Sequence, residues 1–307
     1  MSSQYLYAPG LKELALGLEE SPVIYSGVLP MAKMAMGDWA KFLIFPSMLS
    51  AELAERDDSL RVKCIFVIPD WMTDEYELTE ANAFNIKLEG RTYNNQPDPE
   101  ACHNNRVEHW IEIFKEDLDN LLDGANPFDI ELLSSAALIK ENSQFKSFIR
   151  FALKNPDELI ELARTIFHEQ EILADPVGFV GVSCRQCFKL DGISTYIDEW
   201  DRVQFECASC GHKQEADIIE QSYWIHEYLC EAAVICASEP TIKIIRAGEN
   251  EKKYEYMDKI SNLVISGYSR EISTLIIPNI DSERGGYRLN ELIDLAKDWE
   301  KPEAEIA

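Results

Sequence analysis

Four cysteines in two closely spaced pairs are the residues of this chain with the clearest chemistry. Cys184 and Cys187 are separated by two residues, as are Cys207 and Cys210, and nineteen residues lie between the pairs. Thiolates at this spacing turn back on one metal ion, and two such pairs complete a tetrahedron of Zn–S bonds of about 2.3 Å. Four protein ligands leave no position for water or substrate, so we expect a structural zinc ion. Four cysteines without a metal are the simpler alternative.

A second group of polar residues could bind a small molecule. Asp70 follows an apolar run, and His103 and His109 flank the start of an amphipathic segment. A carboxylate at the end of a strand can pair with a substrate amine, and imidazoles can bind a ligand or exchange protons. Each residue also has an ordinary structural role available. Asp70 could cap a helix, and the two histidines could be packed and hydrogen-bonded.

The segments around these residues predict a parallel α/β sheet. Short apolar runs at 23–27 and 62–68 are typical of buried strands, and residues 38–55 between them have helical spacing, with Pro46 expected to kink the helix. Strand, helix and strand in this order form the unit of a doubly wound fold. Further strands are predicted at 241–245 and 274–277.

The remaining pattern predicts helices and a division into three parts. Helices are expected at 11–18, 108–122, 145–153, 157–167 and 289–299, and loops at 94–105 and 249–255. We predict that residues 1–179 form the first half of a Rossmann-like domain with a helical insertion. Residues 180–215 would form the zinc-binding module, and residues 216–307 the second half of the domain.

The composition excludes several classes of protein. The apolar fraction of 46% can fill a large core, and the formal net charge of −26, from 55 acidic and 29 basic residues, would repel the phosphates of a nucleic acid. The longest apolar runs are far shorter than the roughly 20 residues that a membrane span needs. The N-terminus shows no secretory signal, which together with the paired cysteines predicts a cytoplasmic protein with no membrane partner.

Three stretches together resemble the archaeal-type class I lysyl-tRNA synthetases. Residues 25–30 and the following run Met34-Ala35-Met36-Gly37-Asp38 lie where that family has its His-Ile-Gly-His signature after the first strand. Residues 97–105, with His109, resemble the family's Asp-Pro-x-x-Cys-His loop, and the paired cysteines follow where the family carries its zinc insertion. The resemblance covers residues 20–240. It implies a Rossmann-like catalytic domain of the class I synthetase (HUP) type that uses lysine, ATP with Mg²⁺ and tRNA.

The resemblance also implies roles for individual residues. In the position of the family's amino-acid pocket, Tyr25 and Gly27 would form the floor. The carboxylate of Asp70 would face the substrate amine. The candidate residues for substrate binding are Tyr25, Gly27, Asp70, His103 and His109, and those for nucleotide binding are Gly37, Asp38 and Arg270.

The nucleotide signature departs from the family at two positions. Ala35 and Asp38 stand where the family has the imidazoles that contact ATP phosphates. A methyl group cannot donate to a phosphate, and a carboxylate repels one. Losing one such donor typically costs about 2.7–4 kcal/mol, which predicts impaired or absent adenylation. The chain ends at Ala307, before the family's anticodon-binding domain, so stable tRNA binding is not expected.

These observations leave three functions open. The first is a relative of the synthetases that binds lysine or a similar amino acid and has lost tRNA charging. The second is an active adenylating ligase in which Lys33, Lys41 or Arg270 replaces the missing imidazoles. The third is a non-catalytic pseudo-synthetase that acts through a protein partner.

Overall fold

The computed structural model of the chain describes residues 3–5, 8–31, 34, 36–72, 91–124, 126–167, 179–246, 251–265, 268 and 272–277. Three residues of the sequence analysis, Lys33, Ala35 and Arg270, lie outside the described residues, as does the helix predicted at 289–299. Among the helices that are described, none has both the length and the apolar character needed to cross a bilayer.

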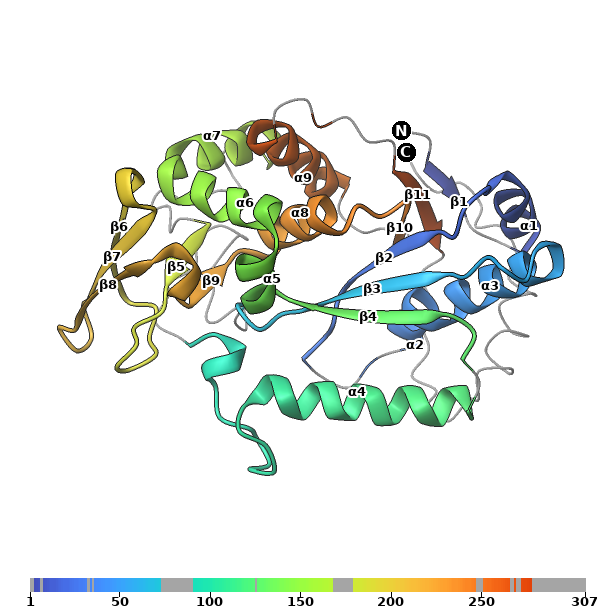
Figure 1. Cartoon of the computed structure of the whole chain (residues 1–307), viewed down its shortest axis with the longest axis horizontal. Coiled ribbons are helices and arrows are strands. Elements are labelled where there is room, and N and C mark those ends of the chain that lie inside the picture. Colours follow the sequence, from blue (N-terminus) through green and yellow to red (C-terminus); the bar gives the residue numbers. More distant parts are fainter. Residues whose placement is uncertain are drawn as a thin grey trace.

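A six-stranded parallel sheet forms the centre of the described structure (Figure 1). The strand order is β1-β11-β10-β2-β3-β4, and each neighbouring pair is parallel. The strand predictions at 23–27, 62–68, 241–245 and 274–277 are confirmed, whereas β1 and β4 were not predicted. The bounds are β1 (Ser3–Tyr5), β2 (Val23–Val28), β3 (Lys63–Ile68), β4 (Asp129–Ser134), β10 (Ile242–Arg246) and β11 (Ser273–Ile277).

Helices cover both faces of this sheet, because successive side chains of its strands point to opposite sides. Ile24 of β2 and Phe66 of β3 belong to one apolar cluster, and Tyr25 and Ile65 belong to the other. The first cluster includes α1 (Ala8–Gly17), α3 (Phe45–Arg56) and α4 (Arg106–Leu122). The second includes α5 (Ser135–Glu141), α6 (Ser143–Lys154), α7 (Pro156–Phe167), α8 (Glu227–Ser238) and α9 (Glu251–Val264). The predicted Rossmann-like fold is therefore confirmed.

The helical segment after β2 is irregular. The short helix α2 (Met36–Trp39) continues into a π-helix, η1 (Ala40–Ile44), and α3 follows with Pro46 in its first turn. Helix was predicted here with a kink at the proline. The irregularity precedes Pro46 instead, because a proline fits the start of a helix, where no N–H partner is needed.

The second α/β portion contains two helices that the sequence analysis did not name. The predicted loop at 249–255 is wrong for residues 251–255, which form the start of α9. Tyr254, Met257 and Ile260 are buried at helical spacing, and their burial outweighs the acidic composition of this stretch.

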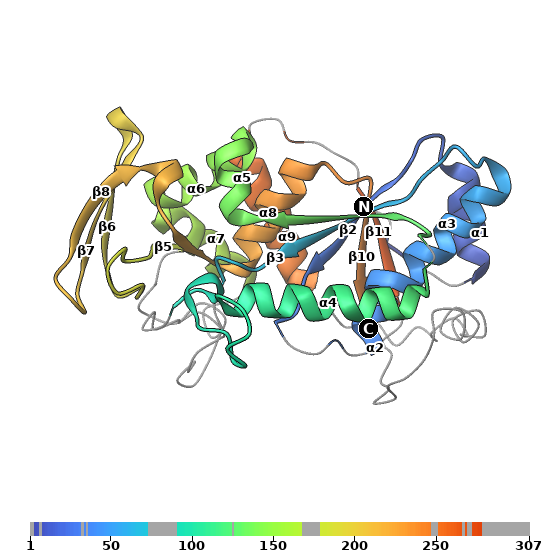
Figure 2. The same ribbon diagram turned by 60° about the horizontal axis from the view of Figure 1, so that its bottom comes forward.

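The paired cysteines belong to a part of the chain with two small antiparallel sheets, seen at one end of the molecule in Figures 1 and 2. One sheet contains β6 (Gly192–Ile197), β7 (Arg202–Cys207) and β8 (Lys213–Asp217). The other pairs β5 (Val180–Val182) with β9 (Tyr223–Ile225). Short 3-10 helices are η2 (Tyr93–Asn95), η4 (Asp198–Trp200) and η5 (Ile218–Glu220). Arg150 of α6 donates to Asp201 at 2.8 Å and ties the three-stranded sheet to the helices.

Candidate functional site

The main sheet has a switch point between β2 and β10. Strands β3 and β4 continue the sheet on one side of this pair, and β11 continues it on the other. The helix α3 after β2 and the helix α9 after β10 belong to opposite apolar clusters. In open α/β sheets, ligands bind in the crevice outside the carboxyl ends of the strands at such a point.

Gly27 and Lys41 meet at the carboxyl end of β2. The pairing of β2 with β3 shifts register between Tyr25 and Gly27, and Gly27 has φ +114°, a conformation that favours glycine. A Cβ at Gly27 would lie 3.3 Å from the Lys41 Nζ atom. Lys41 comes from the π-helix and is buried. The irregular segment after β2 therefore places an ammonium group beside the strand end.

On the other side of β2, Tyr25 contacts a buried acidic residue. Its hydroxyl donates to Glu231 Oε2 of α8 at 2.7 Å, and both side chains are buried. Burial raises the pKa of Tyr25 well above its ordinary value, and Glu231 raises that pKa further. The phenol therefore stays protonated and donates to one carboxylate oxygen of Glu231, and the Lys253 Nζ atom lies 2.6 Å from the other.

Asp70, the carboxylate predicted to face a substrate amine, is directed at the start of α5. It accepts a hydrogen bond from Ser134 Oγ at 2.6 Å and from the backbone N–H groups of Trp71, Ser135 and Ala136 at 3.1, 3.1 and 3.2 Å. Burial raises the pKa of Asp70 despite these donors. This is the geometry of the helix-capping alternative. The structure places Glu231, not Asp70, beside Tyr25.

The two described residues of the nucleotide signature, Gly37 and Asp38, lie in α2. This helix follows β2 after residues 29–35, and its last residue, Trp39, belongs to the first apolar cluster. Arg270, the third candidate, falls outside the described residues.

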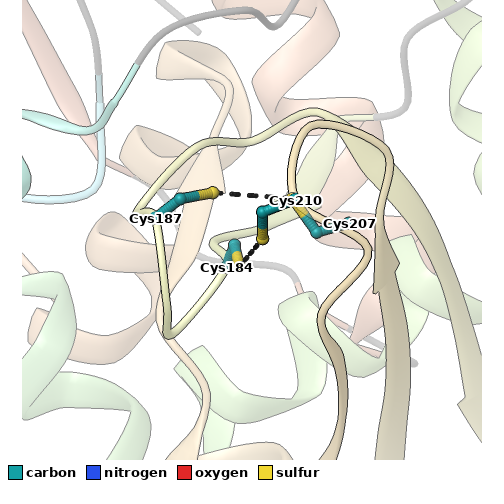
Figure 3. Close-up of side chains that lie close together, drawn as sticks. All are labelled: Cys184, Cys187, Cys207 and Cys210. Carbon is teal, nitrogen blue, oxygen red and sulfur yellow. Dashed lines mark hydrogen bonds between the residues drawn. The ribbon is translucent and has the colours of Figure 1, made fainter.

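The four cysteines converge as the spacing predicts (Figure 3). The Sγ atoms of Cys184 and Cys210 are 3.6 Å apart, and those of Cys187 and Cys207 are also 3.6 Å apart. A tetrahedron with Zn–S bonds of about 2.3 Å has S···S edges of about 3.8 Å, so the four thiols fit one zinc ion. Burial raises the pKa of Cys184, but hydrogen bonds from backbone N–H groups outweigh it and lower that pKa to about 7. At Cys210, a hydrogen bond from the backbone N–H of His212 lowers the pKa, but burial and the neighbouring thiols outweigh it and raise that pKa to about 12.

The two cysteine pairs sit in matching turns. Phe188 N donates to the Cys184 carbonyl at 2.8 Å, and Gly211 N donates to the Cys207 carbonyl at 2.9 Å. Phe188 and Gly211 both have positive φ, at 61° and 71°. Glycine adopts this conformation without strain, whereas phenylalanine does not. The first turn is therefore held in shape against a local preference.

A second group of four possible ligands lies at the start of α4. Asp98, Cys102, His103 and His109 each offer one donor atom, and these atoms lie within 4.8 Å of one another. Cys102 Sγ is 3.0 Å from His103 Nδ1 and 3.3 Å from His109 Nδ1, and His109 Nδ1 is 3.2 Å from Asp98 Oδ1. Tetrahedral zinc with nitrogen, oxygen and sulfur ligands has edges of about 3.3–3.5 Å. We call this set the mixed cluster.

Asp98 organises the loop that carries the mixed cluster. Its carboxylate accepts from the backbone N–H groups of Glu100, Cys102 and His103 at 2.9, 2.6 and 2.5 Å. Burial alone would raise the pKa of Asp98, but these N–H donors outweigh it and hold the pKa far below its ordinary value. Asp98 is therefore an anion throughout the physiological range.

The sequence analysis named His103 and His109 as ligand-binding candidates and did not group them with Cys102. The signal was present as Asp98, Cys102 and His103 within six residues and His109 six residues later. The structure brings these two histidines to the mixed cluster.

Comparison with known proteins identifies the family. The sequence model of the family described as tRNA synthetases class I (K) matches residues 13–225, which is more than half of the chain. The chain belongs to the class I lysyl-tRNA synthetase family. The match includes β2, the mixed cluster and the four cysteines, and it ends before β10.

Curated relatives give the same family. The chain is 27% identical over 48% of its length to the lysine–tRNA ligase of Methanosphaera stadtmanae. It is 23% identical over 70% of its length to that of Pyrococcus horikoshii, and 26% identical over 66% to that of Thermococcus kodakarensis. The matches cover 27%, 35% and 37% of these relatives, so the chain spans about a third of their length or less.

Proposed function

We propose that this class I lysyl-tRNA synthetase relative binds lysine, or an amino acid with a similar cationic side chain, at the switch point between β2 and β10. The observation that carries the proposal is the hydrogen bond from the Tyr25 hydroxyl to Glu231. This contact holds a buried carboxylate next to the middle of β2. A buried carboxylate recognises an ammonium group strongly, because water does not compete with the interaction.

The two sides of β2 differ in charge in a way that suits an amino acid. Glu231 lies on the side of the second apolar cluster, and the Lys41 ammonium lies beside Gly27. A zwitterion with a cationic side chain could direct that side chain toward Glu231 and its α-carboxylate toward Lys41. The absence of a Cβ at Gly27 leaves room between strand and lysine.

We further propose that both four-residue clusters hold zinc with a structural role. The cysteine cluster and the mixed cluster each supply four ligands from the chain, which leaves no open position for a substrate. In this proposal the mixed cluster fixes the loop before α4, and the cysteine cluster fixes the turns that precede β6 and follow β7. His103 and His109 would then be metal ligands and not substrate contacts.

ATP-dependent activation is proposed to be weak. Ala35 and Asp38 replace two phosphate-contacting imidazoles of the family, and Asp38 adds a negative charge. The net charge of −26 also disfavours a stable complex of this chain alone with tRNA. A gel-shift series at rising salt tests the second point, and binding that survives physiological salt would contradict it.

Isothermal titration of L-lysine and L-norleucine into the zinc-loaded chain tests the proposed function. Norleucine has the same aliphatic stem without the ammonium group. We expect heat with lysine and none with norleucine, and loss of the lysine signal in Glu231→Gln. Equal responses to the two amino acids would refute recognition of a lysine side chain.

A second function, adenylation by an unusual route, is favoured by the position of Lys41. Its buried ammonium lies at the strand end, close to the segment that carries the nucleotide signature. A cation there can stabilise charge on a phosphate in place of an imidazole. Lysine-dependent exchange of pyrophosphate into ATP tests this function. Exchange that Lys41→Met abolishes would support it, and absence of exchange would exclude it.

A further inference from the structure

An ammonium group already lies at the carboxylate on which the proposed function depends. Lys253 of α9 places its Nζ atom 2.6 Å from Glu231 Oε1 and 2.5 Å from Glu227 Oε1. Both glutamates come from the first two turns of α8. Glu231 thus accepts from the Tyr25 hydroxyl with one oxygen and meets Lys253 with the other.

Aromatic rings complete the surroundings of the Lys253 ammonium. Its Nζ atom lies 5.3 Å from the ring centre of Tyr228 and 5.9 Å from that of Tyr254. Carboxylates combined with the faces of aromatic rings form a site that selects a cation on an aliphatic stem. We call these four residues, Glu227, Tyr228, Glu231 and Tyr254, the ammonium cradle.

The two carboxylates of the cradle differ in their exposure to solvent. The Glu231 side chain is 4% exposed and that of Lys253 15%, whereas the Glu227 side chain is 45% exposed. Glu227 therefore lies on the solvent side of the cradle and Glu231 on its buried side. Burial would lower the pKa of Lys253, but Glu231 and Glu227 outweigh it and hold the pKa above its ordinary value, so the occupant is charged.

A partly buried group of two carboxylates and one lysine is not the most stabilising contact between two helices. Ion pairs lose hydration when they are buried, and apolar residues of similar volume often stabilise a fold as well or better. The neighbouring contacts between α8 and α9 are made by apolar residues such as Met257 and Ile260. The charged contact lies at the switch-point end of both helices, where a ligand is expected.

We propose that the ammonium cradle is a binding site for primary alkylammonium groups and that Lys253 fills it as an internal substitute for the ligand. This inference rests on the proposed function, because the lysine side chain is the ligand that would compete with Lys253. In the conformation described, lysine binding requires displacement of Lys253 toward solvent. The wild-type affinity for lysine is therefore lower than the cradle alone would give.

The test is rescue of a truncated lysine by a free amine. In Lys253→Ala the cradle keeps both carboxylates and loses the ammonium group that contacts them, while Lys243 stays 4.2 Å from the ring centre of Tyr254. We expect n-butylammonium to raise the melting temperature of this variant, and L-lysine to bind at least about tenfold more tightly than to the wild type. Lys253→Met is the matched control, because it keeps the bulk of the stem and adds no charge. It should bind neither amine.

The effect of n-butylammonium still tests the proposal if Lys253→Ala does not fold without a ligand. The buried carboxylate of Glu231 without a cation destabilises the native state, and a ligand that binds only the native state restores it. Millimolar n-butylammonium in the refolding buffer should then recover a cooperative transition, whereas n-butanol should not. Failure of the amine either to stabilise or to rescue Lys253→Ala overturns the proposal.

The outcomes separate this inference from the proposed function. Micromolar binding of lysine to the wild type, unchanged in Lys253→Ala, would support the function and overturn the role of Lys253. If n-butylammonium binds Lys253→Ala as well as lysine does, the cradle exists but amino-acid recognition fails.

Discussion

The cysteine cluster and the mixed cluster each bring four possible metal ligands together, but they do so by different means. In the cysteine cluster the ligands come from two turns that are far apart in the sequence. The 19 residues between the pairs include β6 and most of β7. In the mixed cluster the ligands come from one stretch of twelve residues, 98–109, organised by the backbone hydrogen bonds of Asp98.

The difference has a thermodynamic consequence. A metal at the cysteine cluster would cross-link two turns that lie 19 residues apart in the sequence, in addition to hydrogen bonds such as Arg185 N to Gln214 Oε1 at 2.8 Å and Ala208 N to the Asp191 carbonyl at 2.9 Å. The loop of the mixed cluster has a network of its own, because Asp98 accepts three N–H groups and Asn105 caps α4 by accepting from Glu108 N. We therefore expect metal to contribute more to stability at the cysteine cluster than at the mixed cluster.

Loss of one thiol at the cysteine cluster should give the largest effect. Cys210 is exposed, so Cys210→Ser removes a ligand with little loss of packing. We expect the melting temperature to fall by more than about 10 °C and the bound zinc to fall by about one ion per chain. The matched variant Cys102→Ser, also at an exposed thiol, should lower the melting temperature much less. Equal effects of the two variants would remove the distinction between the clusters.

Substitution at the organising residue of the mixed cluster should come next. Asp98→Asn keeps the shape of the side chain and removes its charge, so the three N–H donors lose a charged acceptor. We expect the melting temperature to fall by about 5 °C. A variant as stable as the wild type would show that the loop does not depend on this carboxylate.

The acid sensitivity of Asp98→Asn sharpens the same point. The pKa of Asp98 in the folded chain lies well below its ordinary value of 3.8. Its contribution to stability is complete above that ordinary value and is lost as the pH falls through the folded-state pKa. Melting curves from pH 7 downward should therefore show a gap between wild type and Asp98→Asn that closes below about pH 4. A gap independent of pH would assign the effect to something other than the charge.

The two cysteine turns allow a finer comparison, with the smallest effects. Both need positive φ, at Phe188 and at Gly211. Gly211→Ala should lower the free energy of unfolding by about 1 kcal/mol, because a Cβ is strained in this conformation. Phe188→Gly should raise the free energy of unfolding by less than about 1 kcal/mol, because it relieves the same strain in the other turn. The gain is reduced by loss of the contact between the Phe188 ring and Arg91, whose Cζ atom lies 5.9 Å from the ring centre. Urea unfolding measures both changes. If both substitutions changed the free energy of unfolding in the same direction, the two turns would not share the same backbone strain.

The features that the sequence predicted are those written in short, local patterns. Strands β2 and β3 are largely apolar because both of their faces are buried. The metal-ligand spacing of the cysteine pairs is visible in the sequence itself. β4 was missed because Asp129 and Glu131 break its apolar pattern and each of its residues remains at least partly exposed. α9 was missed because the charges at its start hid the spacing of its buried face.

The ammonium cradle could not have been predicted from local patterns. Tyr25 and Glu231 are 206 residues apart, and Lys253 is a lysine in an acidic stretch that looks like ordinary surface. The parallel pairing of β2 with β10 brings the two halves of the chain to one place. A carboxylate expected from the strand end, Asp70, was the nearest candidate that sequence spacing alone could offer.

A crystal structure of zinc-loaded Lys253→Ala with L-lysine tests the central claim most directly. The account predicts the ligand's side-chain ammonium within hydrogen-bond distance of Glu231 and Glu227, with its stem beside Tyr228 and its α-carboxylate toward Lys41. Lysine bound elsewhere, with Glu231 still contacting only groups of the chain, would contradict recognition of lysine at the switch point.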